Sequence, residues 1–171
     1  MTSPKRIFLV GYMGCGKTYT GKRLARKYNV DFVDLDAFIE QRYFKTISKI
    51  FEEKGESEFR RIEKNMLEEV SQFENVIIST GGGTACFFEN MEKMNEVGET
   101  VYLQATPQEL FDYLKNARQN RPLLRDKTDE ELLQFITDAL KQREPFYLKA
   151  KHVVGAADKS DVLFDQLLLD K

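Results

Sequence analysis

A glycine-rich octet near the N-terminus constrains the fold of this chain more than any other stretch. Residues Gly11 to Thr18 read GYMGCGKT, which fits the pattern G-x-x-x-x-G-K-[ST] of loops that bind nucleotide phosphates. Four apolar residues, Ile7–Val10, precede the octet and a helix-forming segment follows it. A glycine-rich turn with a solvated lysine is the alternative reading, but the complete pattern between a strand and a helix favours a phosphate site.

The residue types in this loop suit phosphate binding. Glycines at positions 11, 14 and 16 let the backbone approach a ligand closely, while successive N–H groups and the helix N-terminus supply positive potential. Lys17 is expected to reach the β- and γ-phosphates, and the Thr18 hydroxyl to coordinate Mg²⁺. The nucleotide-binding residues expected in this segment are Gly14, Cys15, Gly16, Lys17, Thr18 and Tyr19.

Length and composition narrow the class of protein. A chain of 171 residues with 42% apolar and 32% charged residues is expected to form one globular domain, 1–171. The net charge of −2 gives no indication of nucleic-acid binding, and Cys15 and Cys86 are too few for a disulfide framework. The N-terminus lacks the apolar core of a signal peptide, and no apolar run approaches the ~20 residues of a membrane span. We therefore expect a cytoplasmic protein without membrane partners, acting as a monomer.

Short β-rich runs alternate with longer helical patterns along the chain. The strand candidates are Ile7–Val10, Phe32–Asp34, Val76–Ser79, Thr100–Leu103 and His152–Val154. Strands that alternate with helices form parallel sheets covered by helices on both faces. The sequence therefore predicts an α/β fold around a central five-stranded parallel sheet.

Three helical segments can be located from local patterns. Between Ser57 and Phe73 apolar residues recur at helical spacing, which places Arg60 and Arg61 beside the buried stripe. Two Thr-to-Glu capping boxes, at 106–109 and 128–131, predict helix starts. Pro122 disfavours a helical conformation at the residue before it, so the earlier of these two helices should end before Arg121.

Two acids follow the second predicted strand. In the run Phe32–Asp36, Asp34 and Asp36 are two residues apart, and on an extended segment such side chains point the same way. Both carboxylates are then expected at the carboxyl edge of the sheet, where ligands of open α/β folds bind. The alternative is that Asp36 merely caps a helix that begins at Ala37.

A triple glycine, Gly81–Gly83, follows the third predicted strand. Consecutive glycines suit a place where backbone N–H groups contact a ligand closely, although a plain flexible turn would use them too. No aspartate follows this strand as it does in many phosphate-loop enzymes. Asp34 is therefore the residue expected in the Mg²⁺ shell.

Arginines make up the last group of candidates. Arg60, Arg121 and Arg143 suit bidentate recognition of a carboxylate or of a transferring phosphoryl group, whereas each alone would read as a solvated surface residue. The segment 118–127 is a polar loop that carries Arg118, Arg121, Arg125 and Lys127, and it is expected to act as a mobile lid.

Taken together, these motifs resemble those of the shikimate kinase family, in the family's order. They are GYMGCGKT, FVDLD, GESEFRRIE at 55–63, TGGG, RPLL at 121–124 and REPFY at 143–147. The resemblance implies a three-layer P-loop kinase fold, similar to nucleoside monophosphate kinases, with a shikimate-binding helical region at about 37–63. It implies transfer of the γ-phosphoryl group of ATP to the 3-hydroxyl of shikimate, with Mg²⁺, in aromatic amino acid biosynthesis.

The resemblance also implies roles for individual residues. Lys17, Asp36 and Arg121 would be catalytic, and Thr18 and Asp34 would hold Mg²⁺, Asp34 through water. The ATP site would further include Arg118 and Arg121, and shikimate would be held by Asp36, Arg60, Gly81, Gly82, Gly83 and Arg143. One departure is that residues 155–161 contain no proline, where the family commonly has a proline-bearing loop at the adenine.

Three other readings share some of these features. A gluconate kinase or a nucleoside monophosphate kinase would keep Gly11–Thr18, but neither explains Arg60, the triple glycine and Arg143 around a strand-end acid. A regulatory nucleotide-binding module would tolerate loss of Asp36 or Arg121, and both are present. A GTPase is disfavoured because the sequence contains no N-K-x-D stretch.

Overall fold

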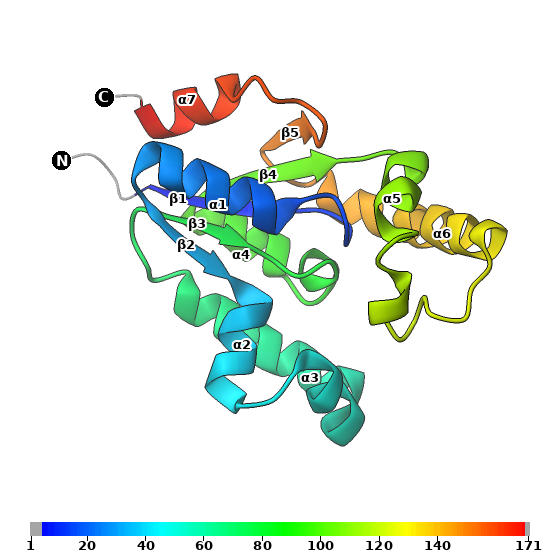
Figure 1. Ribbon diagram of the computed structural model, residues 1–171. Coiled ribbons are helices and arrows are strands. Elements are labelled where there is room, and N and C mark those ends of the chain that lie inside the picture. Colours follow the sequence, from blue (N-terminus) through cyan, green and yellow to red (C-terminus); the bar gives the residue numbers. More distant parts are fainter. Residues whose placement is uncertain (1–4, 170–171) are drawn as a thin grey trace.

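The computed structural model describes residues 5–169, so the first four residues of the N-terminal segment considered above lie outside it. Its centre is a five-stranded parallel sheet in the order β2-β3-β1-β4-β5 (Figure 1). The strands are β1 Arg6–Val10, β2 Asp31–Asp34, β3 Val76–Ser79, β4 Glu99–Gln104 and β5 His152–Gly155. All five predicted strands are present, and the predicted sheet is confirmed.

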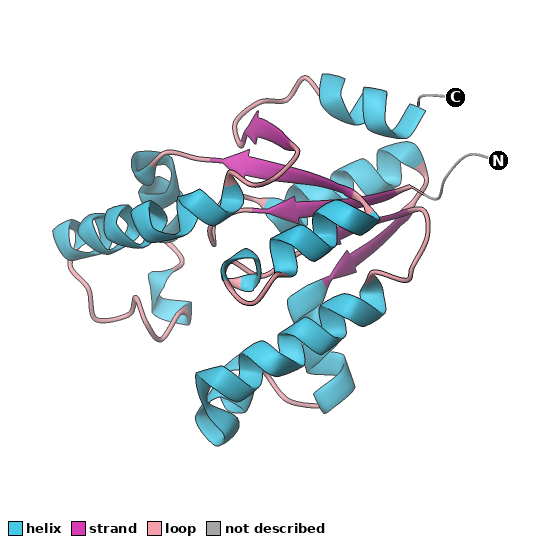
Figure 2. Cartoon of the chain, turned by 180° about the vertical axis from the view of Figure 1, so that it is seen from behind, coloured by secondary structure: helices cyan, strands magenta, loops and turns pink. Residues whose placement is uncertain are grey.

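Helices cover both faces of this sheet. They are α1 Lys17–Tyr28, α2 Leu35–Tyr43, α3 Ile47–Val70, α4 Asn90–Val97, α5 Pro107–Leu114, α6 Asp129–Tyr147 and α7 Val162–Leu169, with short 3₁₀ turns η1 Thr84–Cys86 and η2 Arg118–Asn120. Helix α1 lies over one face and α4 over the other, as the views from the two sides show (Figures 1 and 2). This arrangement confirms the predicted layers.

The phosphate-loop strand is the middle of the sheet. Residues Ile7 to Val10 of β1 are at most 1% exposed, because the strand has a neighbour on each side and a helix layer on each face. A strand buried on both faces reads as a continuous apolar run rather than an alternating one. At Gly21 an added Cβ would lie 2.5 Å from the Phe32 ring, so this glycine lets α1 pack closely onto β2.

The predicted helix at 57–73 is the second half of a longer element. Helix α3 runs from Ile47 to Val70 with a kink at Gly55, whose φ of 79° and ψ of 169° are outside the helical region. Phe73 therefore lies after the helix. The expectation that both arginines lie beside the buried stripe is wrong for Arg60, whose side chain is 11% exposed, and holds for Arg61, which is 72% exposed.

The capping predictions locate α5 and α6. Thr106 and Glu109 form the reciprocal capping box at the start of α5, and Thr128 accepts a hydrogen bond from the Glu131 amide at the start of α6. Helix α5 ends at Leu114, and Arg121 has an extended backbone with φ −124° and ψ 108°. The helix therefore stops before Pro122, as predicted.

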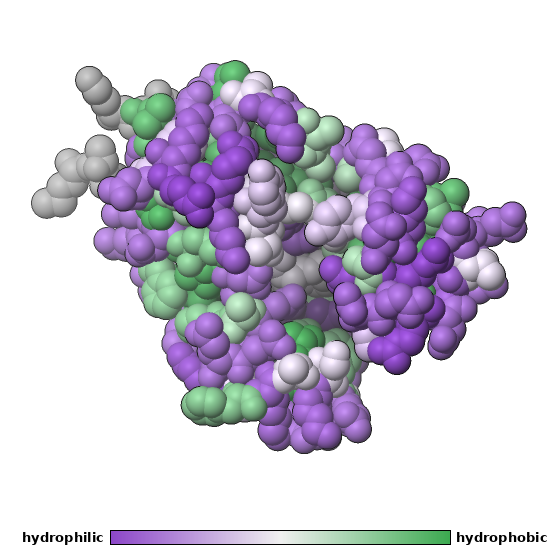
Figure 3. Space-filling view, in the orientation of Figure 1, coloured by the Kyte–Doolittle hydropathy of each residue, from purple (hydrophilic) through white to green (hydrophobic). Residues whose placement is uncertain are grey.

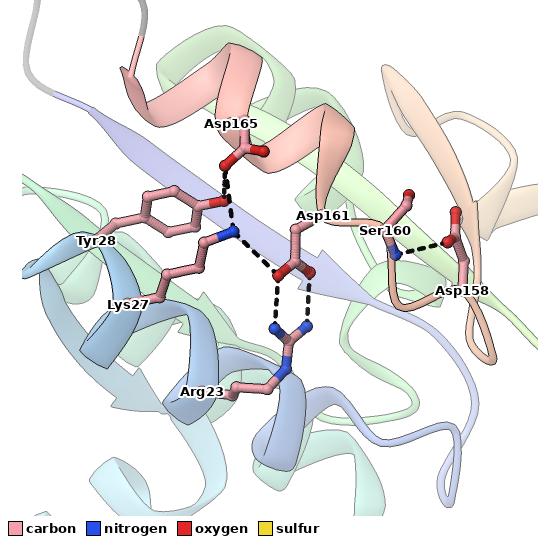
Figure 4. Close-up of polar contacts among 7 residues, drawn as sticks. All are labelled: Arg23, Lys27, Tyr28, Asp158, Ser160, Asp161 and Asp165. Atoms are coloured by element: carbon pink, nitrogen blue, oxygen red, sulfur yellow. Dashed lines mark hydrogen bonds and ion pairs between the residues drawn. The ribbon is translucent and has the colours of Figure 1, made fainter.

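A polar cluster joins the C-terminal helix to α1 (Figure 4). Asp161 accepts two hydrogen bonds of 2.7 Å from the Arg23 guanidinium, and Lys27 lies between Asp161 and Asp165. The Tyr28 hydroxyl donates to Asp165 at 2.6 Å. These contacts hold α7 and the segment after β5 against α1. Within residues 5–169 no helix is both long enough and apolar enough to cross a bilayer.

Candidate functional site

Most of the predicted site residues meet in a cavity of about 190 Å³ at the carboxyl edge of the sheet. A hollow is visible on this side of the molecule, between the part that carries α2 and α3 and the part that carries α5 and α6 (Figure 3). The cavity is lined by Met13, Gly14, Gly16, Lys17, Thr18, Tyr19, Asp34, Asp36, Thr80, Gly81, Gly82, Tyr113 and Arg121.

The phosphate loop has the conformation that its glycines permit. Gly14 and Gly16 have φ values of 84° and 91°, a region that side chains disfavour. The Lys17 side chain is buried, and its ammonium donates to the carbonyl oxygens of Gly11 at 2.7 Å and Tyr12 at 3.1 Å. Cys15 is buried and does not line the cavity.

Asp34 lies at the junction of β2 and α2 and makes two contacts there. The Thr18 hydroxyl donates to its Oδ2 at 2.7 Å, and the Ala37 amide donates to its Oδ1 at 3.0 Å. Asp34 is thus the N-cap of α2, so the alternative in which Asp36 caps this helix is wrong. The Thr18 hydroxyl and the Asp34 carboxylate together form a pair of hard oxygen ligands, the type that Mg²⁺ prefers.

Asp36 lines the cavity, but it does so from a different element than predicted. Strand β2 ends at Asp34 and α2 begins at Leu35, so Asp36 lies in the first turn of a helix and not on an extended segment. Burial raises the pKa of Asp36 to about 6, and the negative charges of Asp34 and Glu63 add to this while Lys17 opposes it. The site thus holds a carboxylate that binds a proton more tightly than an exposed one.

Arg60 is fixed beside the triple glycine by aromatic and acidic neighbours. Its guanidinium carbon lies 4.1 Å from the ring centre of Phe87 and 5.3 Å from that of Phe59. Its Nη1 donates to Glu63 at 3.0 Å. Among the described residues, its Nε is a buried donor with no hydrogen-bond partner. An added Cβ at Gly83 would lie 2.6 Å from Nη2, so a side chain there would displace this guanidinium.

Glu63 was missed by the sequence analysis. It is 1% exposed, and it accepts hydrogen bonds from Arg60 and, at 2.8 Å, from the Thr84 hydroxyl. A signal was available, because Glu63 follows Phe59 by four residues and precedes Met66 by three, which puts an acid on the apolar stripe of α3. An acid at such a position is buried only when it is paired.

The triple glycine is used for close approach rather than for unusual dihedral angles. Positive φ values occur at the phosphate-loop glycines and at Gly55, whereas Gly81–Gly83 have none. An added Cβ at Gly81 would lie 3.0 Å from Asp36 Oδ1, and one at Gly82 would lie 3.2 Å from the Met13 amide nitrogen and 3.5 Å from Arg143 Nη1. Gly81 thus lies next to Asp36, and Gly82 lies next to both the phosphate loop and Arg143.

The two arginines of the predicted lid differ in their placement. Arg121 lines the cavity, and its Nη1 lies 3.7 Å from the Met13 sulfur. Arg118 instead bonds the Lys127 carbonyl at 3.0 Å and pairs with Asp129 at the start of α6. Five of the predicted site residues do not line the cavity: Cys15, Arg60, Gly83, Arg118 and Arg143. The guanidinium groups of Arg60 and Arg143 nevertheless lie next to the glycine run.

Comparison with known proteins agrees with this geometry. A family model described as shikimate kinase matches residues 13–170. A shikimate kinase of Phocaeicola vulgatus is 55% identical over 156 residues, which cover 91% of this chain and 89% of that protein. One of Bacteroides thetaiotaomicron is 54% identical over 156 residues, with the same two coverages.

Solved structures give the same result. A shikimate kinase from Bacteroides thetaiotaomicron superposes with a TM-score of 0.91 at 49% identity, covering 98% of this chain and all of that one. A shikimate kinase from Acinetobacter baumannii in complex with shikimate gives 0.83 at 33% identity, covering 99% and 96%. A gluconokinase from Sinorhizobium meliloti gives 0.55 at 16% identity, covering 98% and 91%, and therefore shares the fold alone. The family match, the identities over nine-tenths of the chain and the superpositions place this chain in the shikimate kinase family.

Proposed function

We propose that this protein transfers the γ-phosphoryl group of ATP to the 3-hydroxyl of shikimate, giving shikimate 3-phosphate and ADP. The observation that carries the proposal is the position of Asp36, which lines the same cavity as the phosphate loop. Its Oδ1 lies 3.0 Å from the position that a Cβ on Gly81 would take. The two arginines at the other glycines of that run complete a site for a small hydroxylated carboxylate.

The nucleotide end of the site is the phosphate loop. Lys17 leaves its two loop carbonyls to reach the β- and γ-phosphates, and the loop amides bind phosphate oxygens. Thr18 and Asp34 would hold Mg²⁺, Asp34 through a water molecule, because both present hard oxygens at one point of the cavity. Bound there, the ion would supply positive charge that neutralises the transferring phosphoryl group.

Asp36 orients the accepting hydroxyl. A carboxylate with a pKa of about 6 is mostly ionised at neutral pH, so it accepts a charge-assisted hydrogen bond from the 3-hydroxyl. The same carboxylate takes up the proton that the hydroxyl loses as the new P–O bond forms. In a loose transition state positioning contributes more than the strength of the base.

Arg60 and Arg143 bind the substrate carboxylate from two sides. Arg60 comes from α3 and is rigidly held, with a buried Nε that has no partner among the described residues. Arg143 comes from the end of α6 and lies 5.4 Å from the Tyr12 ring centre. Two guanidinium groups around a carboxylate give more geometric selectivity than two ammonium groups would.

Segment 118–127 acts as the lid and brings Arg121 to the transferring phosphoryl group. Arg121 already lines the cavity, beside Met13 of the phosphate loop. Arg118 serves the nucleotide once it has released Asp129. The helical region at about 37–63 would serve shikimate, because Arg60 of this region lies beside Gly83 of the glycine run.

The rival acceptors are gluconate and a nucleoside monophosphate, because kinases for such substrates share the phosphate loop. The test measures ADP release with shikimate, gluconate, quinate and AMP as acceptors. We expect turnover with shikimate and essentially none with gluconate or AMP. Turnover on gluconate or AMP without turnover on shikimate would refute the proposal.

The carboxylate assignment is tested separately. Arg60→Lys and Arg143→Lys keep the charge and lose the planar fork, so shikimate binding should weaken by roughly 1–3 kcal/mol. Calorimetry should show ATP binding near that of the parent. Unchanged shikimate affinity in both variants would show that the two arginines do not bind the carboxylate. It would not contradict the proposed reaction.

The remaining expectations concern the setting of the enzyme. We propose that it works in the cytoplasm as a monomer, in the branch of metabolism that makes aromatic amino acids, without nucleic-acid or membrane partners. Light scattering of the purified protein tests the monomer, which should give a mass close to 19.9 kDa.

A further inference from the structure

Tyr147, the last residue of α6, makes a contact that the proposed reaction does not explain. It is fully buried, and its hydroxyl donates to the carbonyl oxygen of Gly82 at 2.5 Å. Burial of a tyrosine hydroxyl is stable only when the group finds a partner. Here the partner is the middle residue of the glycine run at the acceptor site, 65 positions away in the sequence.

The bond to Gly82 fixes more than one atom. Because the peptide unit is planar, anchoring the Gly82 carbonyl also sets the direction of the Gly83 N–H group. A Cβ added to Gly82 would lie 3.2 Å from the Met13 amide nitrogen of the phosphate loop and 3.5 Å from Arg143 Nη1. Gly82 is thus next to both the phosphate loop and Arg143.

Arg143 lies one helical turn before Tyr147 on α6. It precedes Tyr147 by four residues and thus lies on the same face of the helix. Its positive charge opposes the rise in the pKa of Tyr147 that burial causes, so the guanidinium lies near the hydroxyl group. The bond from this hydroxyl to Gly82 thus ties the part of α6 that carries Arg143 to the glycine run.

We propose that Tyr147 is a positioning residue for the acceptor: it holds Arg143 and the Gly81–Gly83 run at the separation that the substrate carboxylate requires. This inference rests on the site assigned under the proposed function. It predicts that loss of the hydroxyl weakens shikimate binding selectively, since Arg143 and the Gly82–Gly83 peptide both gain freedom while the phosphate loop keeps its own contacts.

A purely structural role is the alternative, and the chain offers a matched control for it. Tyr102 of β4 is also buried, and its ring lies 5.1 Å from that of Tyr147. Its hydroxyl donates to Glu144 at 2.7 Å rather than to the glycine run. Tyr102→Phe therefore removes a buried hydroxyl from the same ring pair without touching the acceptor site.

The experiment compares Tyr147→Phe with Tyr102→Phe in the full chain. For Tyr147→Phe we expect the Kd and KM for shikimate to rise roughly three- to tenfold, the effect of one neutral hydrogen bond, with the KM for ATP unchanged. For Tyr102→Phe both constants should stay within about twofold of the parent. Equal rises in the two KM values, or no rise in Tyr147→Phe, would overturn the inference.

A double-mutant cycle keeps the test decisive if either variant loses stability. In the Arg143→Lys background the effect of Tyr147→Phe on shikimate affinity should shrink, because the hydroxyl acts through the arginine; additive losses would count against that coupling. The two assignments fail differently. If the site is wrong, Arg143→Lys alone binds shikimate normally, whereas if only the inference is wrong, Arg143→Lys binds weakly and Tyr147→Phe binds normally.

Discussion

Asp36 is a residue at which function and stability oppose each other. In the proposed reaction its carboxylate acts in the ionised form, yet burial, together with the negative charges of Asp34 and Glu63, raises its pKa from 3.8 to about 6. The folded protein thus binds a proton at this site more tightly than the unfolded chain does. The stabilisation that comes with that proton is complete below pH 3.8 and is lost as the pH rises through about 6.

The first prediction concerns pH. Shikimate turnover should fall as the pH is lowered through about 6, because protonated Asp36 cannot accept the hydroxyl proton. In the absence of ligands, Asp36→Asn should raise the free energy of unfolding at pH 7–8, by up to about 3 kcal/mol, and the gain should vanish near pH 4. Thermal unfolding of parent and variant from pH 4 to 8 measures this. A parent that is more stable than the variant at pH 8 would contradict the assignment.

The second prediction separates the two neighbouring acids. Asp34→Asn removes a charge from the metal shell, so raising Mg²⁺ should recover part of its turnover. Asp36→Asn loses the oriented acceptor contact, on the order of a hundredfold in turnover, and extra Mg²⁺ should not restore it. A Mg²⁺ titration of both variants beside the parent is the measurement. Rescue of Asp36→Asn alone would show that the two roles are reversed.

At the scale of elements, the sheet was predictable and several local placements were not. Alternating strand and helix patterns located all five strands, and Thr106 and Thr128 located two helix starts, because these signals are local. The kink at Gly55 was missed because an isolated glycine within a helical pattern is usually tolerated. Asp36 was placed on a strand because nothing in FVDLD shows that α2 begins directly at Leu35.

Within the candidate site, too, residues in local motifs were predictable and tertiary contacts were not. Residues with a fixed motif, such as Lys17 and Thr18, were located from sequence, whereas partners chosen by tertiary packing were not. Glu63 and Tyr147 contact residues of distant elements, Thr84 and Gly82, and such pairs leave no trace in local spacing. The apolar surroundings of Arg60 arise from Phe51, Phe59 and Phe87, which only the fold brings together.

The third prediction belongs to the proposed lid, segment 118–127. Arg121→Ala should reduce turnover far more than it weakens shikimate binding, because a charge that meets the transferring group acts mainly in the transition state. Arg125→Ala is the matched control, since among the described residues the Arg125 side chain bonds only the Gln119 carbonyl of the same segment. Hydrogen exchange of the segment should slow when ADP and shikimate are added. Equal protection with and without ligands would argue against a lid.

At the scale of the whole molecule, the cluster around Asp161 ties the C-terminal part of the chain to α1 (Figure 4). The bond to Arg23 lowers the pKa of Asp161, with Lys27 contributing. Because the folded-state pKa is depressed, this group stabilises the fold above its unfolded pKa. That stabilisation is lost as the pH falls through the folded value.

The fourth prediction follows from this sign. Asp161→Asn should lower the free energy of unfolding by about 1 kcal/mol at pH 7, or roughly 2–4 °C in Tm, and the difference should shrink below about pH 4. Asp158→Asn is the control, because among residues 5–169 the Asp158 side chain bonds only Ser160 of its own turn. Thermal scans of both variants across pH measure the effect. A difference that persists unchanged at pH 3 would mean that the ion pair is not its cause.

The strand order β2-β3-β1-β4-β5 has an evolutionary consequence. The phosphate loop follows the middle strand, and most residues proposed to bind the acceptor come from the half of the sheet formed by β2 and β3. Except for the end of α6, they lie on one uninterrupted stretch of chain, from Asp31 to Cys86. Acceptor specificity can therefore change in evolution through substitutions in one contiguous segment, while the phosphate loop that binds ATP stays the same. Arg143 and Tyr147 lie outside this segment and would have to change together with it.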